Sequence, residues 1–479
     1  MIYILYLLAG LLALALLLLG IALIRTSLSP AKRSEWEPVP EPERESVYSE
    51  KLSKMVQCET ISERGVENRE KFLKFHKVLE ELFPLVHEKL EKTEIDGNLL
   101  FYWKGKSDER PLVLMGHQDV VPAEGEWLHD PFSGLIEDGK IWGRGSADTK
   151  CSVMAFFQAA EEMLEEDIVP EQDVYLSSSC TEEFGGDGAP KLVAELKRRG
   201  VRPYLVCDEG GAIVQEPIGG IKGYYAMVGV LEKGQGDLLL TAKSGGGHSS
   251  YPPKNSPIAR LSKFVCEIEK KDPMKSEFEP EVRTMFETLG AYGPFAYRLL
   301  FGNLWLFGPL LKKLLPKISP QAGALLKTTI AFTMQSGSEA YNVIPQTATL
   351  GINLRYIPHQ GMEASNAVIE QIANKYDLQM SVESGEDYCE PVNIKGGAYK
   401  IITDAIDKVF PKLPPCPYVM TGGTDARYYQ EICDACIRFS PVVFGPEQME
   451  GMHGLNENID SVSLPGAVDF YKCLVELNK

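Results

Sequence analysis

The sequence is short of positive charge. Its 479 residues include 49 Lys and Arg but 67 Asp and Glu, which gives a formal net charge of −18 at pH 7. Nucleic-acid-binding proteins usually present a basic face, so this balance argues against a nucleic-acid partner. No internal repeat is evident. Because the chain is longer than one hydrophobic core normally supports, we expect two folded domains.

The ten cysteines lack the dense, regular spacing of a disulfide framework. Cys151, Cys180 and Cys207 lie close in sequence to residues with candidate chemical roles, and we expect the cysteines to be reduced, buried thiols. Cys433 and Cys436 form a C-x-x-C pair, but no second pair follows and the segment ICDACIRF alternates like a buried strand. This pattern favours structural packing over redox or metal use.

The first segment lacks charge altogether. Ile2 to Ile24 is apolar and about long enough to cross a hydrocarbon core as a helix. The alternative, a cleaved signal peptide, normally has a basic start and a shorter apolar run. We therefore expect a single-pass transmembrane anchor over residues 1–25. Arg25, Lys32 and Arg33 follow the apolar run, so the positive-inside rule predicts a cytoplasmic main body.

Changes in composition and in the pattern of apolar residues divide the rest of the chain into segments. Residues 26–45 are rich in Pro, Glu and Arg with little apolar content, and are predicted to be a linker. Between residues 46 and 222, apolar runs alternate with helical patterns, as in an α/β structure. Strands with alternating polarity from 223 to 390 indicate a smaller α+β domain inserted into the first. Residues 391–479 then return to the first domain.

One stretch of the inserted region, Tyr292 to Ile318, is crowded with Phe, Trp and Leu. Pro309, Lys312, Lys313 and Pro316 interrupt it too early for a membrane span. We expect a packed helical insertion. The alternative is a surface that dips into a membrane or binds an acyl chain.

Five short segments place polar residues in loops after apolar runs, where open α/β sheets gather ligands. They contain His117 and Asp119 (GHQDVVP), Asp148 (GRGSADTKC), Glu182 and Glu183 (SSSCTEEFGGDG), Asp208 (VCDEGG) and His453 (GMHGLNENI). Each alone has a plain structural reading, such as a helix cap for Asp148. Together, two histidines and several carboxylates suit zinc or a similar divalent ion.

Local geometry adds to two of these segments. His117 and Asp119 are separated by one residue at a strand end, so both side chains lie on the same face and the carboxylate can orient the imidazole. Glu182 and Glu183 are adjacent in an extended segment and point in different directions. One can therefore bind metal while the other faces a bound water.

The ordered motifs HxDxVP, GRGxxDxK, EE, DEG and MHGxNE resemble the aminoacylase and glutamate carboxypeptidase family of two-zinc peptidases. They span Pro111 to Asn458. NLWLFGP, YNVIP and TGGTDAR are most similar to carboxypeptidase S, also called Gly-Xaa carboxypeptidase, and to the N-fatty-acyl-amino-acid hydrolases. The resemblance implies an α/β zinc-peptidase domain with a mixed sheet between helices, and an inserted α+β lid or dimerisation domain.

The resemblance also implies roles for the residues of these motifs. Two zinc ions, or similar ions such as Co²⁺ or Mn²⁺, would share Asp148, with His117 and Asp208 completing one site and Glu183 and His453 the other. Glu182 becomes the general base, and Asp119 orients His117. Because the family has either Asp or Glu at the position of Asp208, the adjacent Glu209 is the alternative ligand.

Substrate contacts follow from the same resemblance. They are His248, an oxyanion donor that often acts across a dimer interface, together with Asn342, Arg355, Gly422 and Thr424. The planar fork of Arg355 suits an α-carboxylate, although GINLRYIP also fits the exposed face of a strand. The expected reaction releases a C-terminal amino acid from a small peptide or an N-acyl amino acid. The alternatives are a related deacetylase or desuccinylase, and a catalytically silent binding protein on the same fold.

Overall fold

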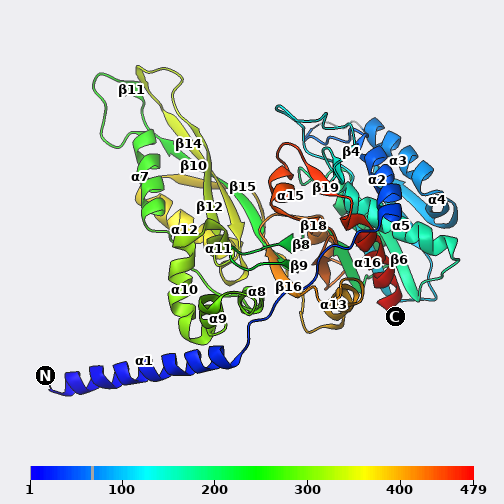
Figure 1. Ribbon diagram of the computed structural model, residues 1–479. Coiled ribbons are helices and arrows are strands. Elements are labelled where there is room, and N and C mark those ends of the chain that lie inside the picture. Colours follow the sequence, from blue (N-terminus) through cyan, green and yellow to red (C-terminus); the bar gives the residue numbers. More distant parts are fainter. Residues whose placement is uncertain (1, 66–68) are drawn as a thin grey trace.

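The computed structural model describes residues 2–65 and 69–479 and contains a large sheet and a smaller one (Figure 1). The strand order of the large sheet is β1 (Glu91–Ile95), β2 (Asn98–Trp103), β6 (Gln172–Ser178), β3 (Ser107–Met115), β7 (Leu205–Asp208), β17 (Cys436–Arg438), β9 (Tyr224–Glu232), β8 (Ala212–Gln215) and β18 (Val443–Phe444), and β16 (Pro415–Met420) also pairs with β9. β3 is parallel to β6 and β7, whereas β2 is antiparallel to β1 and β6. The sheet is therefore mixed, as predicted.

Helices pack on this sheet and complete what we call the main domain. They are α2 (Pro42–Val56), α3 (Glu70–Leu82), α4 (Pro84–Lys89), α5 (Lys150–Glu165), α6 (Gly188–Arg198), α13 (Gly397–Val409), α14 (Ala426–Tyr429), α15 (Pro446–Gly451) and α16 (Ser463–Leu477). α5 contacts β3 and β6 and packs against α16, and α6 contacts β2 and α14. Residues 111–115 of β3 are buried without interruption, which is typical of a parallel strand covered on both faces. A separate sheet of β4 (Leu135–Glu137), β5 (Lys140–Trp142) and β19 (Asn458–Asp460) joins early and late segments of the chain.

The smaller sheet forms a second unit with its own core, which we call the small domain. Its strand order is β12 (Thr329–Ser336), β14 (Thr347–Tyr356), β10 (Gly234–Lys243) and β15 (Gln379–Glu386), all antiparallel, and it carries α7 (Pro257–Lys270), α12 (Met362–Lys375) and the short helix η1 (Pro358–Gln360). Its far end is a two-stranded ribbon of β11 (Gly247–His248) and β13 (Val343–Ile344) (Figure 1). Leu238, Leu240 and Ile352 belong to a hydrophobic cluster of this unit.

The change from one domain to the other comes later than expected. β9 was expected to begin the inserted domain, but it pairs with β8, β16 and β17 of the large sheet. The small domain starts with β10 at Gly234. β9 is buried on nearly every residue, whereas β10 alternates between buried and exposed positions. Two consecutive strands therefore belong to different sheets.

A group of four helices interrupts the sequence of the small domain, between α7 and β12, and packs on the main domain. These helices are α8 (Pro280–Gly290), α9 (Phe295–Phe301), α10 (Leu304–Ile318) and α11 (Pro320–Ala324). Phe286, Phe301 and Leu311 share a hydrophobic cluster with Met227 of β9 and Val419 of β16. The predicted helical packing of this segment is confirmed, and we refer to α8–α11 as the helical insertion.

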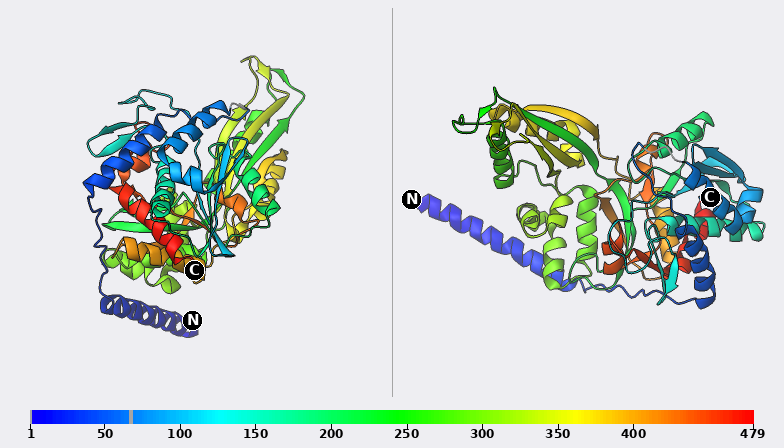
Figure 2. Two further views of the ribbon diagram at one scale, coloured as in Figure 1. Left: turned by 90° about the vertical axis from the view of Figure 1, so that its right-hand side faces the viewer. Right: turned by 90° about the horizontal axis from the view of Figure 1, so that it is seen from above.

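The N-terminal helix α1 (Ile2–Leu28) projects from the molecule beside α9 (Figures 1 and 2). Within residues 2–65 and 69–479 it is the one helix long and apolar enough to cross a membrane, a criterion that a signal sequence also meets. The following linker is extended and packs against the main domain. Trp36 packs edge-on against Tyr224 and Phe410, and Ser34 donates a hydrogen bond to the carbonyl of Tyr224.

All ten cysteines are unpaired. Eight are buried, including Cys433 and Cys436, in agreement with a packing role for the C-x-x-C segment. Cys266 departs from the expectation because it is exposed, and Cys58 is partly buried.

Candidate metal and catalytic site

The predicted ligands converge at one edge of the large sheet. His117 follows β3, Glu182 and Glu183 follow β6, and Asp208 is the last residue of β7. These three strands are parallel neighbours, so their carboxyl ends meet at the same edge. Asp148 lies just before α5 and His453 just after α15, and both reach this edge.

Asp148 lies between the two histidines. Nε2 of His117 is 3.0 Å from Oδ1 of Asp148, and Nε2 of His453 is 3.1 Å from Oδ2. Nε2 of His453 is also 3.0 Å from Oε2 of Glu183. One ligand atom from each of His117, Asp148 and Glu183 lies within 4.8 Å of the others. A carboxylate with one oxygen toward each histidine suits a ligand shared by two ions.

The charge of the cluster fits bound cations. Oε1 of Glu183 is buried and has no hydrogen-bond partner among the described residues. Burial, followed by the negative charge of Asp148, raises the pKa of Glu183 to about 7, and burial raises the pKa of Asp208 to about 6. Buried carboxylates without enough positive partners are costly, and divalent cations relieve that cost. With imidazole and carboxylate donors, these residues suit zinc.

Asp119 has more contacts than the sequence suggests. Its carboxylate lies 3.5 Å from Nδ1 of His117, which also lies 2.9 Å from the Asp119 carbonyl oxygen. The same carboxylate accepts hydrogen bonds from the backbone N–H groups of Glu182 and Glu183, at 3.2 and 3.1 Å, and from the Ser62 hydroxyl at 2.5 Å. Asp119 thus fixes the histidine and the two-glutamate loop together.

Sequence reasoning missed Glu457 as a site residue, although it lies in the MHGxNE motif. It is fully buried, pairs with Arg144 at 2.6 Å and accepts hydrogen bonds from the backbone N–H groups of Gly145, Ala147 and Asp148 at 2.9 to 3.0 Å. A single carboxylate thereby holds the glycine-rich loop that presents Asp148 against the loop that presents His453.

The position predicted for Asp208 has two acidic residues in reach of the cluster. Asp208 is buried, and each of its carboxylate oxygens accepts one backbone N–H group, from Glu209 and Ala426, both at 2.8 Å. Each oxygen keeps a second lone pair, so these hydrogen bonds orient the carboxylate and still leave it able to bind a metal ion. Glu209 lines the cavity described below, and burial raises its pKa well above the usual range.

We expect Asp208→Asn to lower the metal content of the purified protein, because the amide is a much weaker ligand than the carboxylate. Glu209→Gln should leave the metal content unchanged. The measurement is elemental analysis of the metal-to-protein ratio in the purified variants. The reverse pattern, loss with Glu209→Gln alone, would transfer the ligand role to Glu209.

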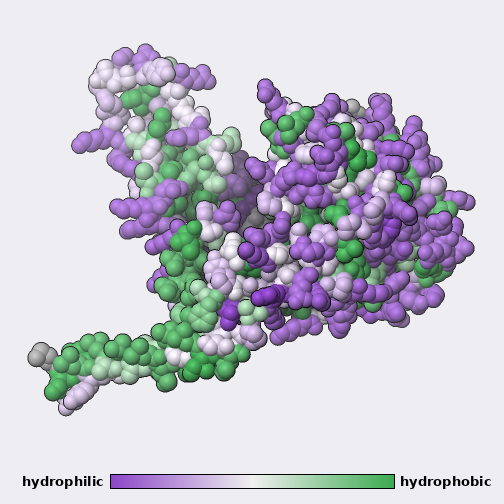
Figure 3. All heavy atoms as spheres, in the orientation of Figure 1, coloured by the Kyte–Doolittle hydropathy of each residue, from purple (hydrophilic) through white to green (hydrophobic). Residues whose placement is uncertain are grey.

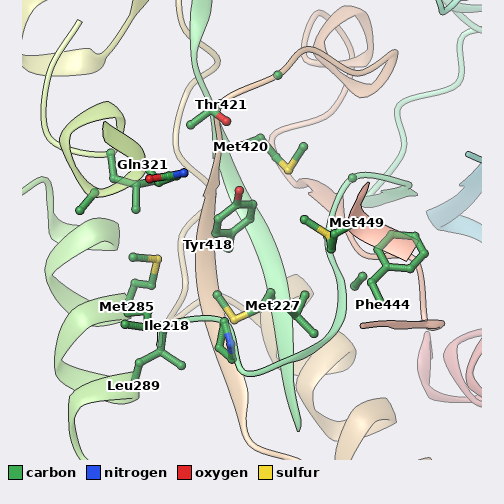
Figure 4. A pocket seen from close by; sticks show the side chains of 18 of the residues that line it. Ile218, Met227, Met285, Leu289, Gln321, Tyr418, Met420, Thr421, Phe444 and Met449 are labelled. Carbon is green, nitrogen blue, oxygen red and sulfur yellow. The ribbon is translucent and has the colours of Figure 1, made fainter. Parts of the chain in front are cut away.

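A cavity of about 820 Å³ begins at this cluster and extends to the helical insertion. Its polar part is lined by Asp148, Glu182 and His453, and by the loop that contains the predicted substrate contacts Gly422 and Thr424. Elsewhere the lining is apolar. Figure 4 shows Met227 of β9, Ile218, and Met285 and Leu289 of α8 around one space, and Leu300, Phe301, Leu311 and Leu315 line the same cavity.

The predicted contacts of the small domain lie elsewhere. His248 and Asn342 meet at the far ribbon, where the N–H of Ser249 bonds to the Asn342 carbonyl at 3.1 Å, and both side chains are exposed. Arg355 on β14 bonds to Oε1 of Gln235 at 3.1 Å. None of the three lines the cavity. This chain alone, in this arrangement, does not bring them to the ligand cluster.

Comparison with known proteins decides the family. The model of "Peptidase family M20/M25/M40" matches residues 113–477, a span that includes every predicted metal ligand. The chain belongs to this peptidase family. As a member of this family of metallopeptidases it is an enzyme of the hydrolase class.

Individual M20 relatives cover nearly the whole chain. A carboxypeptidase S-like protein of Dictyostelium discoideum is 32% identical and covers 89% of this chain and 84% of its own length. An N-fatty-acyl-amino acid synthase/hydrolase of Xenopus tropicalis is 33% identical and covers 98% and 94%. The crystal structure of an M20 metallo-carboxypeptidase from Sulfolobus solfataricus, at 18% identity, gives a TM-score of 0.67 over 90% of this chain and 99% of that one. The last comparison shows the shared fold.

Proposed function

We propose that this M20 enzyme hydrolyses the amide bond between an acyl group and an amino acid with a free carboxylate, using two zinc ions or similar divalent ions. The observation that carries the proposal is the single cavity, which joins the ligand cluster to an apolar chamber. The names of the Xenopus and Dictyostelium relatives support N-acyl amino acids and small peptides as substrate classes.

The ions, held by the five ligands with Asp148 shared, would acidify a water and polarise the scissile carbonyl. Glu182 lies in the same cavity and takes the proton of the attacking water. Glu182 then passes that proton to the leaving amine. The hydrogen bond from the Glu182 backbone to Asp119 fixes the position from which Glu182 acts.

The apolar chamber supports a long acyl chain. Met285 and Leu289 of α8 face it together with Phe301, Leu311 and Leu315 of the helical insertion. Burial of each methylene group of a bound chain contributes about 0.8 kcal/mol. A short acetyl group leaves most of this surface unused, so the chamber favours fatty acyl groups over the acetyl and succinyl groups of the alternative substrates.

The small domain supplies the remaining proposed contacts. His248, Asn342 and Arg355 reach the substrate only if this domain closes over the site or if a second copy of the chain presents its own. We retain both routes within the proposal, with Arg355 as the clamp for the amino-acid carboxylate.

We propose that α1 is a single-pass membrane anchor. Its exposed surface is uncharged from Ile2 to Ile24 and has no core to cover it among the described residues. Arg25, Lys32 and Arg33 near its end favour a cytoplasmic main body by the positive-inside rule.

Filling the chamber at Ala322 tests the acyl-chain assignment. Ala322 of α11 is half-buried and lines the cavity. We expect Ala322→Phe to lower kcat/KM about tenfold for an N-palmitoyl amino acid and less than about twofold for the N-acetyl analogue, since a bulky side chain blocks only the long chain. The measurement is initial-rate release of the free amino acid.

The control is Ala367→Phe, the same change at an exposed position of α12. It should alter neither rate. Substrates whose carboxylate is converted to an amide should be poor for every variant. Equal losses for both acyl lengths in Ala322→Phe alone would place the acyl chain outside this chamber, and a wild-type preference for acetyl would favour the deacetylase alternative.

A further inference from the structure

An exposed apolar row on α10 lies beside the mouth of the cavity. Leu310, Leu314 and Ile318 follow one another at four-residue spacing and so lie on one face of the helix. Their exposed fractions are 57%, 42% and 65%. Leu314 and Ile318 also line the cavity. The cavity therefore opens at this row.

Basic residues border the row. Lys313 and Lys317 are exposed on the same helix, each one residue before a member of the row. Lys312 instead forms an ion pair with Glu277, with Nζ 2.6 Å from Oε2. A helix that exposes an apolar row beside lysines is typical of the boundary between lipid headgroups and acyl chains.

The end of α1 is fixed against the same helices. Nη2 of Arg298 in α9 donates to the carbonyl oxygens of Thr26 and Ser29, both at 3.0 Å. The side chain of Asn303, just before α10, donates to the Thr26 hydroxyl at 3.1 Å. Lys32 N–H bonds to the Ala291 carbonyl at 3.0 Å. In Figure 3 the hydrophobic surface of α1 continues onto the helical insertion.

We propose that the row on α10 contacts the lipid bilayer that holds α1, and that amphiphilic substrates pass from that bilayer through the mouth into the cavity. The inference rests on the proposed function, since it needs a substrate with a long acyl chain. Such a chain resides in lipid, and a mouth in contact with lipid lets it move into the apolar chamber without crossing water. The lysines suit the headgroup level and the carboxylate of the substrate.

The first test places a fluorescent reporter in the row of the full-length protein, reconstituted in phosphatidylcholine vesicles. Leu310→Trp is compared with Met334→Trp, at an exposed position of β12 in the small domain. Because α1 contains no tryptophan, it adds no signal of its own. We expect phosphatidylcholine brominated on its acyl chains to quench the added fluorescence of Leu310→Trp and not that of Met334→Trp. Equal quenching, or none at Leu310→Trp, would overturn the proposal.

The second test measures access. Leu310 does not line the cavity, so Leu310→Ser should leave hydrolysis of a water-soluble N-acetyl amino acid unchanged. For an N-palmitoyl amino acid supplied in the vesicles, we expect kcat/KM of Leu310→Ser to fall about fivefold, with no fall for Met334→Ser.

An unchanged rate for Leu310→Ser would overturn the route of access. Absence of hydrolysis by the wild type would instead overturn the proposed function, and the quenching would still report on lipid contact. Protection of Leu310 by a second copy of the chain, seen by cross-linking, would also contradict lipid contact.

Discussion

Glu182→Gln is expected to lower kcat about 10³-fold while the protein keeps its metal ions. The amide has nearly the shape of the carboxylate but cannot accept the proton of the attacking water. Glu182 lines the cavity beside the ligand cluster but is not one of the five proposed ligands, so metal binding should survive. The measurements are the single-turnover rate on an N-acyl amino acid and the metal-to-protein ratio of the same preparation.

Glu165→Gln is the matched control, because it makes the same chemical change at an exposed position of α5. It should change neither the rate nor the metal content. If Glu182→Gln retained full turnover, the general base would lie elsewhere in the cavity, and Glu209 would be the next candidate. If Glu182→Gln lost metal together with activity, Glu182 would be a metal ligand. The proposed roles of Glu182 as general base and Glu183 as ligand would then be wrong.

Asp148→Asn should remove both of the proposed metal ions at once. One oxygen of Asp148 faces each histidine, so the change weakens two sites that otherwise have separate ligands. Loss of groups that merely support a ligand already costs about 10- to 100-fold in metal affinity, and loss of a shared ligand should cost at least about 100-fold at each site. Zinc titration by calorimetry and the zinc-dependent rise in Tm would both report it.

Asp434→Asn, at an exposed position, serves as the control for this change. Chelation of the wild type should abolish turnover, and added zinc should restore it, whereas Asp148→Asn should not respond to zinc. A variant that still binds one ion with unchanged affinity would show that Asp148 serves a single metal.

The candidate ligands are predicted by the resemblance of the ordered motifs to a known family, and local patterns explain why these residues lie close together. An apolar run ends in His117 and Asp119, another ends in Asp208, and parallel neighbours bring such ends together. The role of Asp119 in holding the Glu182 and Glu183 backbone could not be predicted, since it depends on the separation of two loops. The same holds for Glu457, whose partners lie about 310 residues earlier in the chain.

The domain boundary and the linker show where local patterns fail. β9 has an apolar sequence that suits either sheet, and its pairing with β8 and β16 is decided by long-range contacts. In the linker, a single aromatic residue, Trp36, finds a place between Tyr224 and Phe410, which composition alone does not indicate. The positions of His248 and Arg355 relative to the cluster depend on how two domains are oriented, and no periodicity reports that.

The place of β17 in the large sheet has a consequence for biosynthesis. β17 comprises residues Cys436 to Arg438, yet it pairs with β7 on one side and with β9 on the other. Until the ribosome has released this late segment, the edges of β7 and β9 lack their native partner and expose hydrogen-bonding groups that other strands can capture. We therefore expect a nascent or truncated chain to bind chaperones. A premature stop codon before Cys436 should yield aggregated protein.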